Sequence, residues 1–201
     1  MRVNIAFRFL RELTDELASP DDFFTRKKNE SWRNGFIFFL SITSILSIAT
    51  PVMNYLGFQS NDFSSAYQAQ IIAYNFAKAN LIEVYGTYAY FIEAALIMIL
   101  SLPILVSLTV LLHVVYRLIG GQGSILNAWK AACYGVGPCL LGGFLPYVSL
   151  FAGFYSFAMQ FYLGPMTLYN AKQSRAIVIF VAFITLAFIE MLVLGTTVGT
   201  K

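Results

Sequence analysis

The chain contains a run of 41 residues, from Ala131 to Ala171, without a single charged side chain. One helical crossing of the roughly 30 Å hydrocarbon layer of a membrane takes about 20 residues. The run is therefore long enough for two crossings. Glycine and proline cluster near its middle, at Gly142-Gly143-Phe144-Leu145-Pro146, where a turn is expected. The stretch predicts a helical hairpin inside a membrane.

The composition of the whole chain agrees with a membrane environment. The 201 residues are 58% hydrophobic and 11% charged, whereas a soluble domain is about 25% charged. We therefore expect an all-α, polytopic membrane protein with a single membrane domain. The net charge of +3 comes without a basic stripe, so no nucleic-acid partner is expected. Two cysteines provide neither a disulfide framework nor metal-ligand spacing, and we expect no metal and no cofactor.

Five membrane crossings are predicted within a transmembrane domain over residues 34–196, at about 35–55, 87–116, 126–143, 146–168 and 176–195. The basic residues provide an independent test of this layout. If the N-terminus is cytoplasmic, eleven of the 13 lysines and arginines lie on the cytoplasmic side, and only Lys78 and Lys201 lie outside. This asymmetry is what the positive-inside rule requires. The predicted topology has a cytoplasmic N-terminus and an outer C-terminus.

Three further segments do not cross the membrane in this layout. Residues 1–33 form a cytoplasmic, amphipathic N-terminal segment, in which residues 2–18 are either a helix on the leaflet or a partly ordered tail. Ser19-Pro20-Asp21-Asp22 then predicts a new helix, with a capping serine, proline in the first turn and acidic residues at the positive end. An amphipathic helix on the outer surface is expected at about 62–82.

Glycine and proline recur around the uncharged run in a particular order. Arg117-Leu-Ile-Gly-Gly-Gln-Gly-Ser124 comes first, followed by Tyr134-Gly-Val-Gly-Pro138, Leu145-Pro146 and Tyr162-Leu-Gly164. This succession resembles the Yip family (Ypt-interacting proteins) of integral membrane proteins. The positions that carry the resemblance are Gly120, Gly121, Gly123, Tyr134, Gly135, Pro138, Pro146 and Gly164.

The resemblance implies a five-helix membrane domain with a cytoplasmic N-terminus. Eukaryotic members act in vesicle traffic and bind prenylated small GTPases and one another. About 33 residues precede the first predicted crossing here, as in the short archaeal and bacterial members. A small GTPase is accordingly expected as a partner only if the host is eukaryotic, in Golgi or endoplasmic reticulum membranes. A prokaryotic host implies the plasma membrane, with the bilayer, a second copy or other membrane proteins as partners.

The same motif residues have a direct physical interpretation. Small residues let helix backbones approach closely in a membrane. Ala131, Gly135, Cys139 and Gly143 are spaced to form one smooth face of the third crossing, with Ser149, Gly153 and Ser156 as a matching patch on the fourth. Pro138 predicts a bend. The loop from Gly120 to Ser124 lacks the lysine of a nucleotide-binding loop, so we interpret it as a hinge in which Ser124 caps the next helix.

Glu93 and Glu190 are the candidate functional residues inside the membrane. Each lies about five or six residues from the outer end of its predicted crossing, roughly 8 Å deep at ~1.5 Å per residue. Buried carboxyl groups are costly in hydrocarbon and often mark a pathway or a partner contact. Either the two share a proton or cation, or each reaches the interface or a neighbouring helix.

Two functions remain open at this point. The first is a non-enzymatic protein that organises membranes or recruits partners, as the resemblance implies. The second is a small transporter or channel subunit that uses Glu93 and Glu190. Catalytic residues are not expected, because the sequence has no His-Glu-x-x-His, no Gly-x-Ser-x-Gly and no Ser–His arrangement.

Overall fold

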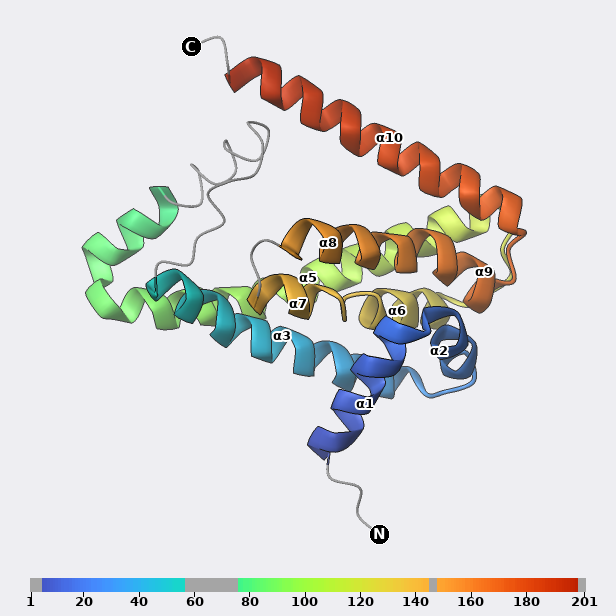
Figure 1. Cartoon of the computed structure of the whole chain (residues 1–201), viewed down its shortest axis with the longest axis horizontal. Helices are drawn as coiled ribbons and strands as arrows, with labels where there is room; N and C mark the ends of the chain where they lie inside the picture. Colours follow the sequence, from blue (N-terminus) through green and yellow to red (C-terminus); the bar gives the residue numbers. More distant parts are fainter. Residues whose placement is uncertain (1–4, 57–75, 145–147, 199–201) are drawn as a thin grey trace.

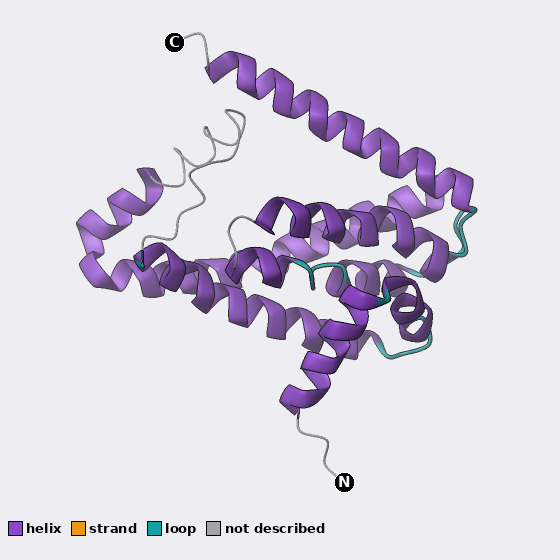
Figure 2. Ribbon diagram, in the orientation of Figure 1, coloured by secondary structure: helices purple, strands orange, loops and turns teal. Residues whose placement is uncertain are grey.

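The computed structural model describes residues 5–56, 76–144 and 148–198, with side chains described for 9–53, 55–56, 76–142, 148 and 151–189. Helices make up nearly all of these residues, and no strand occurs among them (Figure 2). The all-α fold class is therefore confirmed for the described part of the chain. The helices in chain order are α1 (Ile5–Ala18), α2 (Pro20–Lys27), α3 (Trp32–Tyr55), a helix over 76–85, η1 (Gly86–Tyr88), α5 (Ala89–Leu118), α6 (Ile125–Tyr134), α7 (Cys139–Phe144), α8 (Ser149–Ala158), η3 (Met159–Leu163), α9 (Gly164–Tyr169) and α10 (Gln173–Val198).

Two long, apolar helical stretches run through the molecule. By length and composition alone, Trp32–Met53 and Phe76–Leu118 are suited to cross a membrane, and Gln173–Ile189 is a shorter apolar helix. The stretch Phe76–Leu118 is bent at Gly86, which has φ +56°. Only 17% of its most apolar window is buried inside the protein, so most of this apolar surface faces outward, as expected for a helix in contact with lipid.

The predicted outer helix at 62–82 is described only in its last part. Residues 76–85 are helical and end where the chain turns at Gly86. The remainder of that prediction, 62–75, lies outside the described residues, as does Pro146. The surroundings of Gly143, which belongs to the predicted close-packing face, also lie outside the described part of the chain.

The third predicted crossing is not one continuous helix. α6 ends at Tyr134, the chain passes through turns at 135–138, and α7 begins at Cys139. The expectation of one smooth face from Ala131 through Cys139 is therefore wrong, because the helical register is lost between them. Pro138 lacks a backbone N–H and stands directly before α7, which explains why the helix breaks here instead of bending.

The fourth predicted crossing runs through α8, η3 and α9 without an interruption. Its middle part, η3, is a π-helical segment, a geometry in which one extra residue is accommodated in a turn. Of the patch predicted on this crossing, Ser156 is buried but Gly153 faces open space. The expectation that Gly153 packs against the third crossing is therefore wrong.

α10 is exposed over most of its described length. It packs against η3 and α9 near its start and then diverges from the other helices toward the C-terminus (Figure 1). Apolar side chains on its described part, such as Val178, Leu186 and Phe188, are more than half exposed. In a membrane these side chains would contact lipid.

α1 and α2 pack against the bundle instead of forming a loose tail. Leu13 and Glu16 of α1 are buried, whereas Leu10 is 58% exposed. Phe23 and Phe24 of α2 are buried in the same hydrophobic core as residues of α3 and α5. The predicted start of α2 is confirmed, with Pro20 in its first turn, although Ser19 makes no side-chain cap hydrogen bond.

Candidate functional site at the polar end of the bundle

α2, the loop 119–124, the start of α6 and the turn 170–172 meet at one end of the bundle, which we call the polar end. Side chains and backbone groups link these segments. Lys28 Nζ donates to Asn170 Oδ1 at 2.5 Å, and the Gln122 N–H donates to the Tyr169 carbonyl at 2.6 Å. Arg175 Nη1 donates to the Ile119 carbonyl at 3.0 Å. The polar end is thus a cross-linked assembly of segments that are far apart in the sequence.

Tyr169, the last residue of α9, is the centre of this assembly. Its hydroxyl donates to the Ser124 carbonyl at 2.7 Å and hydrogen-bonds with Nδ1 of His113. Its ring packs edge-on against the ring of Tyr116, with centroids 4.8 Å apart. This contact places His113 of α5 against the last residue of α9 and ties the two helices together.

The glycines of the first motif lie against this tyrosine. A Cβ on Gly123 would come within 2.8 Å of the Tyr169 ring, and a Cβ on Gly121 within 2.9 Å of its Cβ. Gly120 has φ +81°, a conformation that side-chain-bearing residues rarely adopt. Ser124 stands at the N-cap position of α6 but makes no side-chain cap hydrogen bond. The expected serine cap is therefore wrong, and the Ser124 carbonyl, bonded to Tyr169, fixes the loop.

The later motif residues fasten the uncharged run together. The Tyr116 hydroxyl donates a hydrogen bond to the Gln160 carbonyl. The same hydroxyl lies against Gly164, where it leaves no room for a Cβ. Gly135 lies against the Gln160 side chain, and its carbonyl accepts a hydrogen bond from Ser156. These contacts satisfy backbone groups that are freed where α6 ends and where η3 departs from α-helical geometry.

Tyr134 holds α2 onto α6. Its ring meets the Phe23 ring edge-on at 5.2 Å, and the Lys27 ammonium lies 5.2 Å from the centroid of each of these two rings. A desolvated cation over an aromatic face contributes about 2 kcal/mol. The Tyr134 hydroxyl reaches Glu30 Oε2 at 3.4 Å.

Lys27 is also the cation of a buried charge cluster. Its Nζ lies 3.1 Å from Glu12 Oε1 and 3.0 Å from Glu30 Oε1, while its side chain is only 6% exposed. A charge this enclosed is stable only because it is paired on several sides. Lys130 extends the cluster by donating to the Lys28 carbonyl at 2.7 Å. The cluster therefore joins α1, α2 and α6.

Glu16 lies one helical turn beyond Glu12 and is fully buried against Gly137, in the break between α6 and α7. Burial and the nearby Glu12 raise the pKa of the Glu16 carboxyl well above its ordinary value, and a smaller opposing effect comes from the Gly137 backbone and Lys27. The carboxyl is accordingly favoured in its neutral form.

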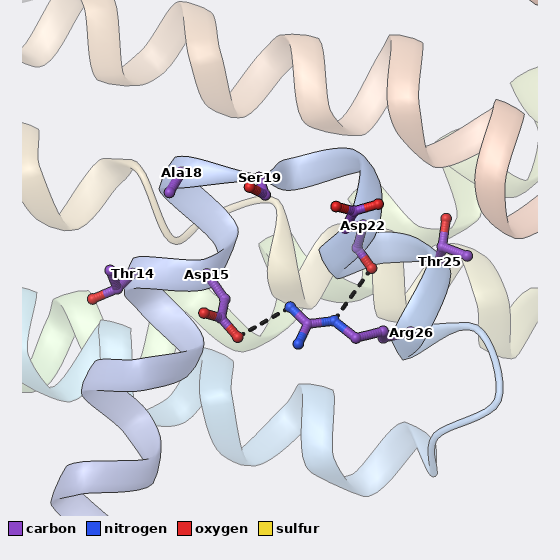
Figure 3. A pocket seen from close by; sticks show the side chains of 7 residues that line it. All are labelled: Thr14, Asp15, Ala18, Ser19, Asp22, Thr25 and Arg26. Carbon is purple, nitrogen blue, oxygen red and sulfur yellow. Dashed lines mark hydrogen bonds and ion pairs between the residues drawn. The ribbon is translucent and has the colours of Figure 1, made fainter.

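A polar groove lies between α1 and α2 on the outer surface of the polar end (Figure 3). The Arg26 guanidinium crosses it, with Nη2 3.0 Å from Asp15 Oδ2 and Nε 3.4 Å from the Asp22 carbonyl. The lining residues are Thr14, Asp15, Ala18, Ser19, Asp22, Thr25 and Arg26. Its polar atoms are open to solvent and suited to contact another macromolecule.

The predicted carboxylate pair lies elsewhere. Glu93 is the fifth residue of α5, just beyond its first turn, and is 9% exposed. Arg117 stands at the other end of α5, beside the polar end, and roughly 35 Å of helix separates it from Glu93. Glu93 is therefore remote from the polar end. Glu190 belongs to α10, but its side chain lies outside the described residues. Among the described residues, no group of three or more His, Cys, Asp or Glu side chains is suited to hold a metal ion.

The buried acidic residues of α1 and the central position of Tyr169 were not predicted. Glu12 and Glu16 are four residues apart and therefore lie on one face of α1. Leu13 lies beside them and is apolar. The available signal for a buried acidic residue was therefore a carboxyl group at helical spacing next to an apolar position. Tyr169 gave no such signal, because nothing in its neighbourhood distinguishes it from the other aromatic residues of the apolar run.

The sequence was compared with protein families, with curated proteins and with solved structures. Residues 16–194 match the family described as the Yip1 domain. No curated protein and no solved structure matches the chain. The matched range begins at Glu16 and includes α2, all the long apolar helices and every motif residue described above. The chain therefore belongs to the Yip1 family, whose members are generally non-enzymatic membrane proteins related to membrane trafficking.

Proposed function

We propose that this protein is a membrane-anchored recruiting protein that binds a partner protein on the exposed face of α1 and α2. The observation that carries this proposal is the way those two helices are held. Phe23 and Phe24 are at most 1% exposed, while Asp22, Thr25 and Arg26 on the same helix are exposed. One face of α2 is therefore fixed in the core and the opposite face is presented to solvent.

A surface held in this way is suited to recognition. A loose tail has to lose conformational entropy when it binds, and that loss subtracts from the affinity. Here the Lys27 cluster and the Tyr134 contact have already ordered α2. The groove beside Arg26 offers both donors and acceptors at fixed positions, which favours specificity for a charged or polar partner surface.

The polar end faces the cytoplasm in this proposal, and the chain crosses the membrane five times. Support comes from the basic residues that the fold gathers at this end: Arg26, Lys27, Lys28, Arg33, Arg117, Lys130, Lys172 and Arg175. Lysine and arginine concentrate on the cytoplasmic side of membrane proteins. Trp32 and Trp129, whose rings meet at 6.5 Å, stand where a membrane interface would lie.

The test is site-specific photo-crosslinking in native membranes. A photoreactive amino acid at Asp22 or Thr25 is expected to capture one or a few proteins reproducibly. The same probe at Val178, an exposed apolar position on α10, serves as the control and should capture lipid. Yip proteins bind Rab GTPases, so a GTPase is the expected adduct in a eukaryotic host. Adducts that contain only lipid or a second copy from positions 22 and 25 would contradict partner recruitment.

A transport function is the second candidate, favoured by the burial of Glu93 within an apolar helix. It predicts a proton- or cation-dependent flux in proteoliposomes that is lost when Glu93→Gln and Glu190→Gln are combined while the protein stays folded. Purified protein that supports no flux under any ion gradient would remove this candidate. The recruiting function predicts instead that Glu93→Gln and Glu190→Gln leave the crosslinks from α2 unchanged.

A further inference from the structure

Glu16 is a buried carboxyl group that no contact at the polar end uses. Its side chain is fully buried near the end of α1, and neither carboxyl oxygen has a hydrogen-bond partner among the described residues. The Gly137 N–H lies close enough to influence the carboxyl but does not reach hydrogen-bonding geometry. An ionised carboxylate without donors in such a place is strongly disfavoured.

The carboxyl is seated in the helix break. Gly137 lies between the end of α6 at Tyr134 and the start of α7 at Cys139. A Cβ at position 137 would collide with Oε2 of Glu16 and would stand 2.7 Å from Oε1. Glycine at this position is thus what leaves room for the carboxyl, so the break and the end of α1 fit each other.

The groups around Glu16 do not neutralise it. On its own helix Glu12 repels a negative charge, and on α2 the Lys27 ammonium is already paired with Glu12 and Glu30. On α8 the Tyr155 hydroxyl donates to the Leu17 carbonyl at 3.1 Å.

α7 presents the remaining titratable neighbour, the Cys139 thiol, which is in electrostatic contact with Glu16. The nearby Ser156 hydroxyl is already used by the Gly135 carbonyl. The Tyr155 hydroxyl, the Ser156 hydroxyl, the Lys27 ammonium and the Gly137 N–H, which donates to the Tyr134 carbonyl, are thus all engaged elsewhere. A proton on Glu16 itself neutralises the carboxyl without any of these donors.

We propose that Glu16 and the helix break at Gly137 form a proton-binding site that controls whether α1 is docked on the bundle. With the proton bound, the neutral carboxyl fits into the break and the end of α1 stays packed. When the proton leaves, the carboxylate regains solvent only if the last turns of α1 move off the bundle. This site does not depend on partner recruitment, since its ligand is the proton and its contacts are internal.

The site can be tested with the full chain reconstituted in nanodiscs, in a background with Cys133→Ala and Cys139→Ala. A thiol at Leu13, which is 9% exposed, is protected while α1 is docked. A thiol at the neighbouring exposed Thr14 serves as the matched control for the intrinsic effect of pH on the reaction. The measured quantity is the ratio of maleimide labelling rates, position 13 over position 14, between pH 5 and pH 8.

With Glu16 present, this ratio is expected to rise with pH, by up to about tenfold per pH unit in the range between the free and the docked pKa of Glu16. In Glu16→Gln, which is neutral and of the same size, the ratio should stay low and flat. Gly137→Ala should raise the ratio at every pH, because the added methyl group occupies the place of the carboxyl. A flat ratio with Glu16 present, or the same rise in Glu16→Gln, would overturn the proposal.

Discussion

The hydroxyl of Tyr169 donates a 2.7 Å hydrogen bond to the carbonyl oxygen of Ser124, and the ring of the same tyrosine fills the space beside Gly121 and Gly123. One side chain at the end of the uncharged run thereby closes the loop that precedes it. The sequence favoured a hinge in this loop. In this protein the loop is packed, and its glycines make room for a ring.

Replacing Tyr169 separates the effect of its ring from that of its hydroxyl. Tyr169→Phe keeps the ring and loses the hydrogen bonds to Ser124 and His113, so a cost of about 1 kcal/mol in unfolding free energy is expected. Tyr169→Ala empties a fully buried position and should cost about 3–5 kcal/mol. Thermal unfolding in detergent measures both, and equal costs for the two variants would show that the ring packing against the glycines does not matter.

The loop can be probed from its own side through Gly123. Gly123→Ala brings a methyl group within 2.8 Å of the Tyr169 ring, and we expect a loss of about 1–3 kcal/mol from overpacking. Combined with Tyr169→Ala, the same substitution should cost far less, because the ring is gone. Additive losses in the double variant would mean that the two residues do not interact.

Lys27 and Arg26 are adjacent in α2 and both form ion pairs, which allows a matched comparison. Lys27 is 6% exposed and pairs with Glu12 and Glu30, whereas Arg26 is 55% exposed and pairs with Asp15. Lys27→Met removes the buried cation that Glu12 and Glu30 share and should cost about 3–5 kcal/mol. Arg26→Met should cost less than about 1 kcal/mol. Unfolding midpoints in detergent that ranked the two variants in the reverse order would refute the buried cluster.

Glu16 is expected to make stability depend on pH. Its pKa in the folded protein is raised above the ordinary value, chiefly by burial and then by Glu12. The folded state thus holds the proton more tightly, and stability is full below the ordinary pKa and falls as pH rises toward the raised one, by at most about 1.4 kcal/mol per pH unit. Glu16→Gln should be flatter between pH 5 and pH 8 and more stable at pH 8. If the wild-type protein instead became more stable relative to Glu16→Gln as the pH rises, the pKa of Glu16 would be lowered by folding, which contradicts this prediction.

Local signals along the chain identified much of the fold. Pro20 with Asp21 and Asp22 predicted the start of α2, because proline and acidic residues suit the first turn of a helix. Pro138 correctly indicated a disturbance in the third predicted crossing. Its extent was underestimated, since a proline next to glycines at 135 and 137 permits a full break with turns between two helices.

The candidate site was harder to predict, because it depends on contacts between distant parts of the chain. Nothing near Glu16 in the sequence shows that Gly137 leaves a space for it, and nothing near Lys27 shows that Glu12 of α1 reaches it. An amphipathic pattern places these residues on a face of α1 or α2 but does not say what that face packs against. The family resemblance identified the glycines, whereas only the fold shows that Tyr169 and Glu16 lie against them.

In the function proposed above, the polar end, with its packed loop and the groove of α1 and α2, faces the cytoplasm of a five-crossing protein. Cysteine accessibility in sealed, oriented membranes tests it most directly, with single thiols placed by Gln122→Cys in the exposed part of the loop and by Gln70→Cys between the first two predicted crossings. A membrane-impermeant reagent added from outside should label position 70 and should reach position 122 only after the membrane is opened. Labelling of position 122 in intact cells, with position 70 protected, would mean that the polar end faces outward.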